Sequence, residues 1–81
     1  MKIRLKVFAS IRDICGFDEK EITLSEASTL DGLIDSLAAQ YKGLGEKRGS
    51  LLMAVNAEYS TGGTILRDND TVALFPPVSG G

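Results

Sequence analysis

The first residues of the chain alternate between apolar and polar side chains. Ile3, Leu5 and Val7 fall on one face of an extended segment, and the other face carries Lys2, Arg4, Lys6 and Phe8. Because successive side chains of a strand point to opposite sides, this pattern predicts a first strand over residues 2–8 with one buried face.

A second strand is expected over residues 19–24, where Ile22 and Leu24 point inward. The preceding segment, residues 10–16, ends at Gly16 and predicts a short helical turn or loop. We therefore expect the two strands to pair as a wide hairpin.

The middle of the chain has the spacing of one amphipathic helix, over about residues 29–42. Ser28 is the expected N-cap, and Asp31 three residues later completes an imperfect capping box. The apolar stripe is typical of a helix that packs on a sheet, and it consists of Leu30, Leu33, Ile34, Leu37 and Tyr41. Residues 42–50 hold three glycines and four charges without periodicity, which predicts a flexible surface loop.

Three further strands are expected, over residues 51–55, 58–59 and 71–75. Asn56-Ala57 predicts a turn, and Asp68-Asn69-Asp70 predicts another in which Asn69 adopts the left-handed conformation. This order favours an α+β domain, with a mixed sheet of four to five strands and one main helix packed on one face. We expect this domain to span residues 1–77, with the other sheet face open and residues 78–81 forming a flexible C-terminal tail.

Composition limits the class of function. The chain has 81 residues, a net charge of −2, one cysteine and no histidine. A core of this size leaves little room for a buried pocket, which disfavours a self-contained enzyme, and the charge gives no footprint for nucleic acid. No apolar segment is long enough to cross a membrane and the charged start is unlike a signal peptide, so we expect a cytoplasmic protein without membrane contact. The lone Cys15 agrees with a reducing compartment, and without histidine no imidazole base or Cys/His zinc site is available.

The chain ends in Phe75-Pro76-Pro77-Val78-Ser79-Gly80-Gly81. Since proline cannot continue a central strand, we expect the chain to leave the domain here. A terminal glycine pair has no Cβ and can lie extended in a narrow channel, which makes the last carboxylate a candidate working group. The alternative is a frayed end without a role.

Several segments together resemble the small subunit of molybdopterin synthase, a sulfur carrier of the ubiquitin-like β-grasp family. They run along the whole chain and are Phe8-Ala9, Arg12-Asp13, Gly16, Val55-Asn56, Asp68-Asn69-Asp70, Val72 and the closing heptapeptide. Asn69 departs from the glycine common at this turn in the family, although asparagine tolerates the same backbone.

The resemblance implies a reaction sequence at the tail. An E1-like adenylyltransferase would activate the α-carboxylate of Gly81, which follows Gly80, and a sulfur donor system would convert the adenylate to a thiocarboxylate. The large synthase subunit would then take up the tail, so that two such sulfurs reach cyclic pyranopterin monophosphate in molybdenum cofactor biosynthesis. The chain itself would be a non-catalytic carrier with no cofactor of its own.

Three alternatives stay open. The chain could be a ubiquitin-like protein modifier conjugated to lysines through Gly81, a sulfur carrier for another pathway such as thiazole synthesis, or an interaction domain with an inert tail.

The resemblance also implies a partner surface. If strands 2–8 and 71–75 are parallel neighbours, Phe8 and Phe75 project together from the open face, and Tyr59 extends the patch. The expected partner-binding residues are Phe8, Tyr59, Phe75, Pro76, Pro77 and Val78. Alternatively, Phe8 tucks under the loop before Gly16. The basic side chains of the first strand either contact an acidic partner or are only solvated.

Cys15 and the Arg12-Asp13 pair each have a structural and a functional interpretation. Cys15 is expected to be a small packing residue, because Asp13 and Asp18 nearby would not lower its pKa. The adjacent Arg12 and Asp13 form either a surface ion pair or a partner contact.

Overall fold

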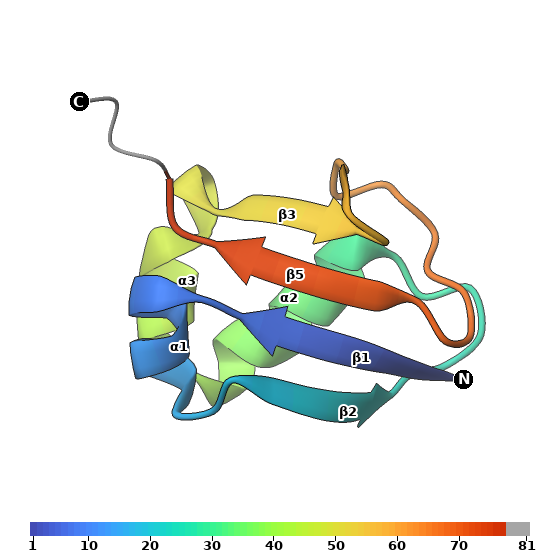
Figure 1. Cartoon of the computed structure of the whole chain (residues 1–81), viewed down its shortest axis with the longest axis horizontal. Coiled ribbons are helices and arrows are strands. Elements are labelled where there is room, and N and C mark those ends of the chain that lie inside the picture. Colours follow the sequence, from blue (N-terminus) through green and yellow to red (C-terminus); the bar gives the residue numbers. More distant parts are fainter. Residues whose placement is uncertain (78–81) are drawn as a thin grey trace.

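The computed structural model describes residues 1–77. They form a five-stranded sheet in the order β2-β1-β5-β3-β4. The strands are β1 (Lys2–Val7), β2 (Glu19–Thr23), β3 (Leu52–Val55), β4 (Glu58–Tyr59) and β5 (Thr71–Phe75). β1 and β5 are parallel and the other neighbours are antiparallel, so the sheet is mixed. Figure 1 shows the helices behind one face of this sheet, which confirms the expected α+β arrangement.

The core lies between the sheet and α2 (Leu30–Gln40). Every second side chain of β1 and β5 is buried, as alternation along a strand requires, and α2 buries residues at helical spacing. The central buried side chains are Ile3, Leu5, Val7, Leu30, Leu33, Ile34, Leu37, Val72 and Leu74. The main helix is therefore packed as the sequence predicts, although it ends two residues earlier.

The helix cap was predicted one residue too early. Thr29, not Ser28, is the N-cap of α2, and its hydroxyl accepts a hydrogen bond from the Gly32 N–H at 3.1 Å. The Ser28 hydroxyl instead donates to the Ser25 carbonyl at 2.7 Å, because the chain still turns there. Two further N–H groups of the first turn, those of Leu30 and Asp31, donate to carbonyls of the loop at 62–64, so that loop completes the cap.

The predicted surface loop at 42–50 is wrong. It holds α3 (Lys42–Lys47) and a 3-10 turn η1 (Arg48–Ser50). Leu44 is fully buried, so packing of this one side chain outweighs the poor helix propensity of the neighbouring glycines. Gly43 lies so close to α1 that an added Cβ would be 3.2 Å from Ile14.

Smaller differences concern element ends and turns. β1 ends at Val7, and the predicted turn after it is a helix, α1 (Ala9–Cys15), which ends at Gly16 with a φ of 81°. Asn56 and Ala57 form the expected tight turn, with φ values of 51° and 69°. Asn69 has a φ of 71°, which confirms its predicted left-handed conformation.

Candidate functional site

Phe8 and Phe75 form an aromatic stack at the end of the central parallel strands. Val7 pairs with Leu74 in register and both are buried, so the next residue of each chain segment turns to the open face. The two ring centroids are 4.8 Å apart and the rings are nearly parallel, at 9°. Phe8 is still 41% exposed. The prediction that both rings project together is confirmed, and the alternative of Phe8 tucked under the loop is wrong.

The backbone around Phe8 fixes this stack. Phe8 is the extended N-cap residue of α1, and its N–H donates to the Leu74 carbonyl at 3.2 Å. Its own carbonyl accepts from Ile11 and Arg12, at 3.0 and 3.3 Å. The chain enters the helix sharply at Ala9, whose φ is 50°. Phe8 is thus held from both sides, by a strand and by a helix.

A hollow of about 360 Å³ lies beside the stack on the open face. Tyr59 is 77% exposed and lines this hollow together with Phe75, so it extends the aromatic patch as predicted. Alanine side chains leave this space open between the larger side chains of Lys6, Tyr59 and Phe75. Its lining is Lys6, Ala54, Ala57, Tyr59, Thr71, Ala73 and Phe75.

A second hollow, of about 420 Å³, lies on the α1 side of the stack. Phe8 and Arg12 line it, and Lys6 lines both hollows. The aromatic pair therefore forms a ridge between two depressions. Such a relief suits a protein partner, since aromatic side chains flanked by hollows allow close shape complementarity.

Ion pairs offset part of the charge of the basic row of β1. Arg4 pairs with Glu19 at 3.1 Å, Lys6 lies 3.8 Å from the same carboxylate, and Lys2 pairs with Glu21 at 3.4 Å. All of these side chains are largely exposed, so each pair contributes little to stability. The row is consequently less basic than its sequence indicates.

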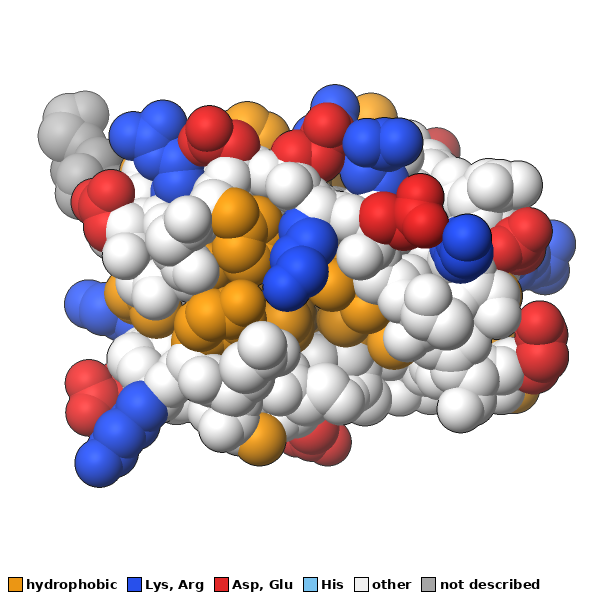
Figure 2. Space-filling view, turned by 90° about the horizontal axis from the view of Figure 1, so that it is seen from below, with side chains coloured by type: hydrophobic (Ala, Val, Ile, Leu, Met, Phe, Trp, Pro, Cys, Tyr) orange, Lys and Arg blue, Asp and Glu red, His pale blue; other side chains and the backbone are white. Residues whose placement is uncertain are grey.

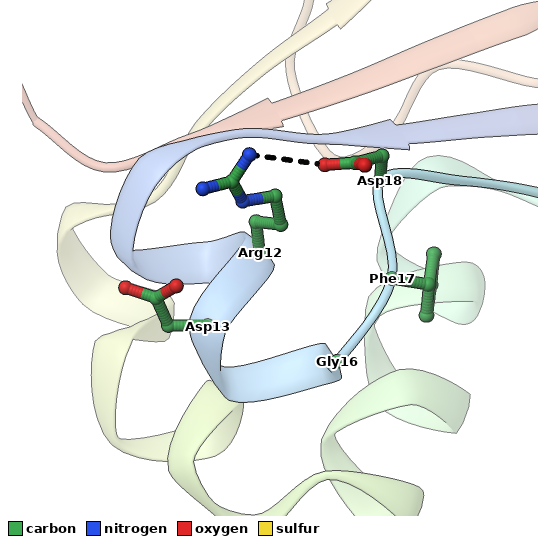
Figure 3. Close-up of a pocket in the computed structure, with 5 residues that line it drawn as sticks. All are labelled: Arg12, Asp13, Gly16, Phe17 and Asp18. Atoms are coloured by element: carbon green, nitrogen blue, oxygen red, sulfur yellow. Dashed lines mark hydrogen bonds and ion pairs between the residues drawn. The ribbon is translucent and has the colours of Figure 1, made fainter.

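Of the two alternatives for Arg12 and Asp13, the ion pair between them is not formed. Arg12 pairs with Asp18 at 3.2 Å, while Figure 3 shows Asp13 pointing away from both, on the other side of α1. Adjacent helical residues point in different directions, whereas the chain after Gly16 folds back and brings Asp18 to Arg12. These residues line a shallow surface hollow with Phe17.

Cys15 packs in the core, as predicted. It is 8% exposed, and burial raises the pKa of its thiol above the usual value. A raised pKa disfavours the thiolate, which is the nucleophilic form. Burial and the direction of this pKa shift therefore favour a packing role for Cys15 over a nucleophilic one.

The root of the tail lies beside the aromatic stack. Phe75 is the last residue of β5, Pro76 after it is half-buried, and Pro77 is exposed. Figure 1 shows β5 leading out of the sheet at this corner. The predicted site residues Val78, Gly80 and Gly81 lie outside the described residues.

Leu52 belongs to the candidate site, although the sequence pattern did not indicate it. It pairs directly with Phe75 in the register of β3 and β5, so its side chain stands beside Phe75 on the open face. A continuous apolar run hides which residues face inward, and only the pairing register resolves it.

Among residues 1–77, no group of three His, Cys, Asp or Glu side chains is placed to hold a metal ion, and no helix is long and apolar enough to cross a membrane.

Comparison with known proteins gives one family. The model of the ThiS family matches residues 5–81. The chain is 37% identical over 81 residues to the molybdopterin synthase sulfur carrier subunit of Escherichia coli (strain K12), covering 98% of this chain and 99% of that protein. It is also 30% identical over 92 residues to small archaeal modifier protein 3 of Haloferax volcanii, and the match covers both proteins completely.

Solved structures agree with this result. A Pyrococcus furiosus protein assigned as molybdopterin converting factor, subunit 1, has a TM-score of 0.87 and 31% identity, covering 96% of this chain and 99% of that chain. A Helicobacter pylori complex of subunits 1 and 2 of molybdopterin-converting factor contains a chain with a TM-score of 0.70 and 26% identity, and the match covers both chains completely. The expected β-grasp fold is confirmed.

Proposed function

Because the chain belongs to the ThiS family, we propose that it is a sulfur carrier and, more narrowly, the small subunit of a molybdopterin synthase. The observation that carries the proposal is the family match through residue 81, which includes the Gly80-Gly81 end. The identity to the sulfur carrier subunit of E. coli, over nearly the full length of both chains, supports the narrower assignment.

The chemistry that we propose takes place at the α-carboxylate of Gly81. In a partner adenylyltransferase, one carboxylate oxygen attacks the α-phosphate of ATP, pyrophosphate leaves, and an acyl adenylate forms. Hydrosulfide supplied by a donor system then attacks the acyl carbon, the bond from this carbon to the AMP oxygen breaks, AMP leaves, and the thiocarboxylate forms. This order is needed because a free carboxylate is a poor acyl donor, whereas the adenylate has a good leaving group.

The proposed role of the domain is to present this group to successive partners. Phe8 and Phe75, with Tyr59 beside their hollow, would form the docking surface next to the root of the tail. Pro76 and Pro77 restrict the backbone and so lower the entropic cost of ordering the tail in a partner. The H. pylori complex of subunits 1 and 2 supports a large subunit as one such partner.

Mass spectrometry tests the proposal. The intact chain is incubated with an adenylyltransferase of this family, ATP and a sulfur donor, and the expected mass increase is that of one oxygen replaced by sulfur. A chain without Gly81 and a chain with a C-terminal tag are the controls, and neither should gain mass. The proposal fails if the intact chain keeps its mass while a known carrier is converted in the same mixture.

A second function is favoured by the match to small archaeal modifier protein 3. We infer that the same activated Gly81 could form an isopeptide bond with a lysine amine, with AMP as the leaving group. Cells that express the intact chain should then show protein conjugates, which disappear when Gly81 is deleted. Conversion to the thiocarboxylate without any conjugates would exclude this second function.

A further inference from the structure

The outer edge of β2 is an unpaired strand edge in the described part of the chain. β2 ends the sheet, with β1 as its neighbour on one side. The Leu24 N–H donates to the Met1 carbonyl at 2.8 Å, and the Asp18 carbonyl accepts from Val7 at 3.0 Å. In an antiparallel pair the residues alternate in direction, so the backbone groups of Glu19, Glu21 and Thr23 point away from β1. They form a row of hydrogen-bonding groups that an extended chain could complete.

An apolar strip borders this edge on the helix side. Ile22 and Leu24 point to that side, and with Phe17 they are only partly buried against the core. Figure 2 looks along this side of the molecule and shows apolar side chains gathered in its middle, with one basic side chain lying across them. A strand added to β2 would place every second side chain against such a strip.

The charge left over at this edge is positive. Glu19 and Glu21 are already paired with cations of β1 on the open face. Lys20 points to the helix side, with its Nζ atom 5.6 Å from the centre of the Phe17 ring, and it takes part in no ion pair within residues 1–77. The complement of an apolar strip with an unpaired ammonium is an apolar segment that carries a carboxylate. A second copy of this edge would bring another Lys20 instead.

We propose that the free edge of β2 binds an extended, acidic segment of a partner protein by strand addition. Two apolar side chains of the segment lie beside Ile22 and Leu24, and an acidic side chain on the same face lies beside Lys20. Main-chain hydrogen bonds to Glu19, Glu21 and Thr23 supply the affinity, and the alternate side chains supply the specificity. This site is separate from the aromatic stack and does not use Gly81, so it stands or falls independently of sulfur transfer.

A synthetic peptide tests the site. The probe is N-acetylated Ser-Val-Thr-Ile-Thr-Asp-Ser amide, which places Val, Ile and Asp on one face of a strand. It is titrated into the full ¹⁵N-labelled chain, and amide shifts are followed by NMR. The expected shifts centre on Glu19, Glu21 and Thr23. Shifts centred on Phe8, Phe75 and Tyr59, or no shifts at millimolar peptide, would overturn the proposal.

Matched controls separate strand addition from other binding. The same peptide, N-methylated at the positions that face β2, should bind at least about tenfold more weakly, because the main-chain hydrogen bonds are lost. Glu21→Pro should weaken binding similarly, since this N–H faces outward and an edge position tolerates proline, whereas Glu21→Ala should not. Equal affinity for the methylated and unmethylated peptides would exclude strand addition.

A charge reversal tests the acidic preference. Lys20→Glu should weaken binding of the Asp peptide and restore binding of the peptide with Lys in its place. An unchanged preference would refute the assignment of Lys20. Sedimentation of the free chain gives the last control, because a dimer that Glu21→Pro dissociates would make a second copy the occupant and overturn the proposal.

Discussion

The Phe8–Phe75 stack should make a measurable and mutually dependent contribution to stability. The changes are Phe8→Ala, Phe75→Ala and both together. Phe8 is 41% exposed, so truncation removes a little more than half of the side chain's contact surface. With about 200 Å² for a phenylalanine side chain and about 25 cal/mol per Å², this loss corresponds to roughly 3 kcal/mol for Phe8→Ala.

The stack adds a coupling term to this loss. Offset aromatic pairs contribute about 0.5–1.5 kcal/mol beyond the area that they bury. The rings are 4.8 Å apart and nearly parallel, which is within the favourable range. The double variant should therefore be destabilised by less than the sum of the two single variants, because the second truncation has no stack left to break.

Urea unfolding of the four proteins, followed by circular dichroism, measures this coupling. Tyr59→Ala is the matched control, since Tyr59 is 77% exposed and its truncation should change the free energy of unfolding much less. A coupling free energy below about 0.3 kcal/mol, which is the level at which independent sites add, would refute a specific stack between the two rings.

Further predictions concern packing, backbone and thiol. Leu44→Ala should lower the free energy of unfolding by about 2–5 kcal/mol, because it opens a cavity at a fully buried position. The exposed Lys47→Ala should lower it by less than about 0.5 kcal/mol. Equal losses for the two variants in urea unfolding would contradict the burial of Leu44 in α3. Ala57→Gly should stabilise the chain or leave its melting temperature unchanged, because glycine relieves a φ of 69°, while Ala39→Gly in the exposed part of α2 should cost about 0.5–1 kcal/mol; the opposite ranking would contradict the turn geometry. Burial raises the pKa of the Cys15 thiol, so the stabilising effect of the protonated thiol is complete below the unfolded pKa and is lost as the pH rises through the folded pKa. A thiol reagent at pH 8 should react far more slowly with the folded chain than with the urea-unfolded chain. Equal rates would refute the burial of this thiol.

Local patterns predicted most of the fold because the central strands β1 and β5 each have one buried face. Ile3, Leu5 and Val7 alternate without interruption, and the helical spacing of α2 is equally regular. The prediction failed at Leu44, where a single buried leucine among glycines decides the structure. A lone apolar residue has no period, and its partners come from other elements, so local sequence could not show it.

The sequence predicted the aromatic residues of the candidate site but not the residues that surround them. Phe8 and Phe75 could be paired because residues that alternate on parallel neighbours share a face. Leu52 and the floor of the hollow depend on how β3 aligns with β5, which no pattern within either strand determines. Likewise, the partner of Arg12 depends on the fold-back after Gly16.

The parallel pairing of β1 with β5 has a consequence for biosynthesis. These strands lie near opposite ends of the chain, yet they are adjacent in the sheet, with Leu5 opposite Val72. A ribosome must therefore release the chain through Phe75 before the middle of the sheet can close, and such long-range contacts slow folding. A prematurely terminated product would lack the strand that completes the core, so cellular proteases should remove it before it could occupy any partner.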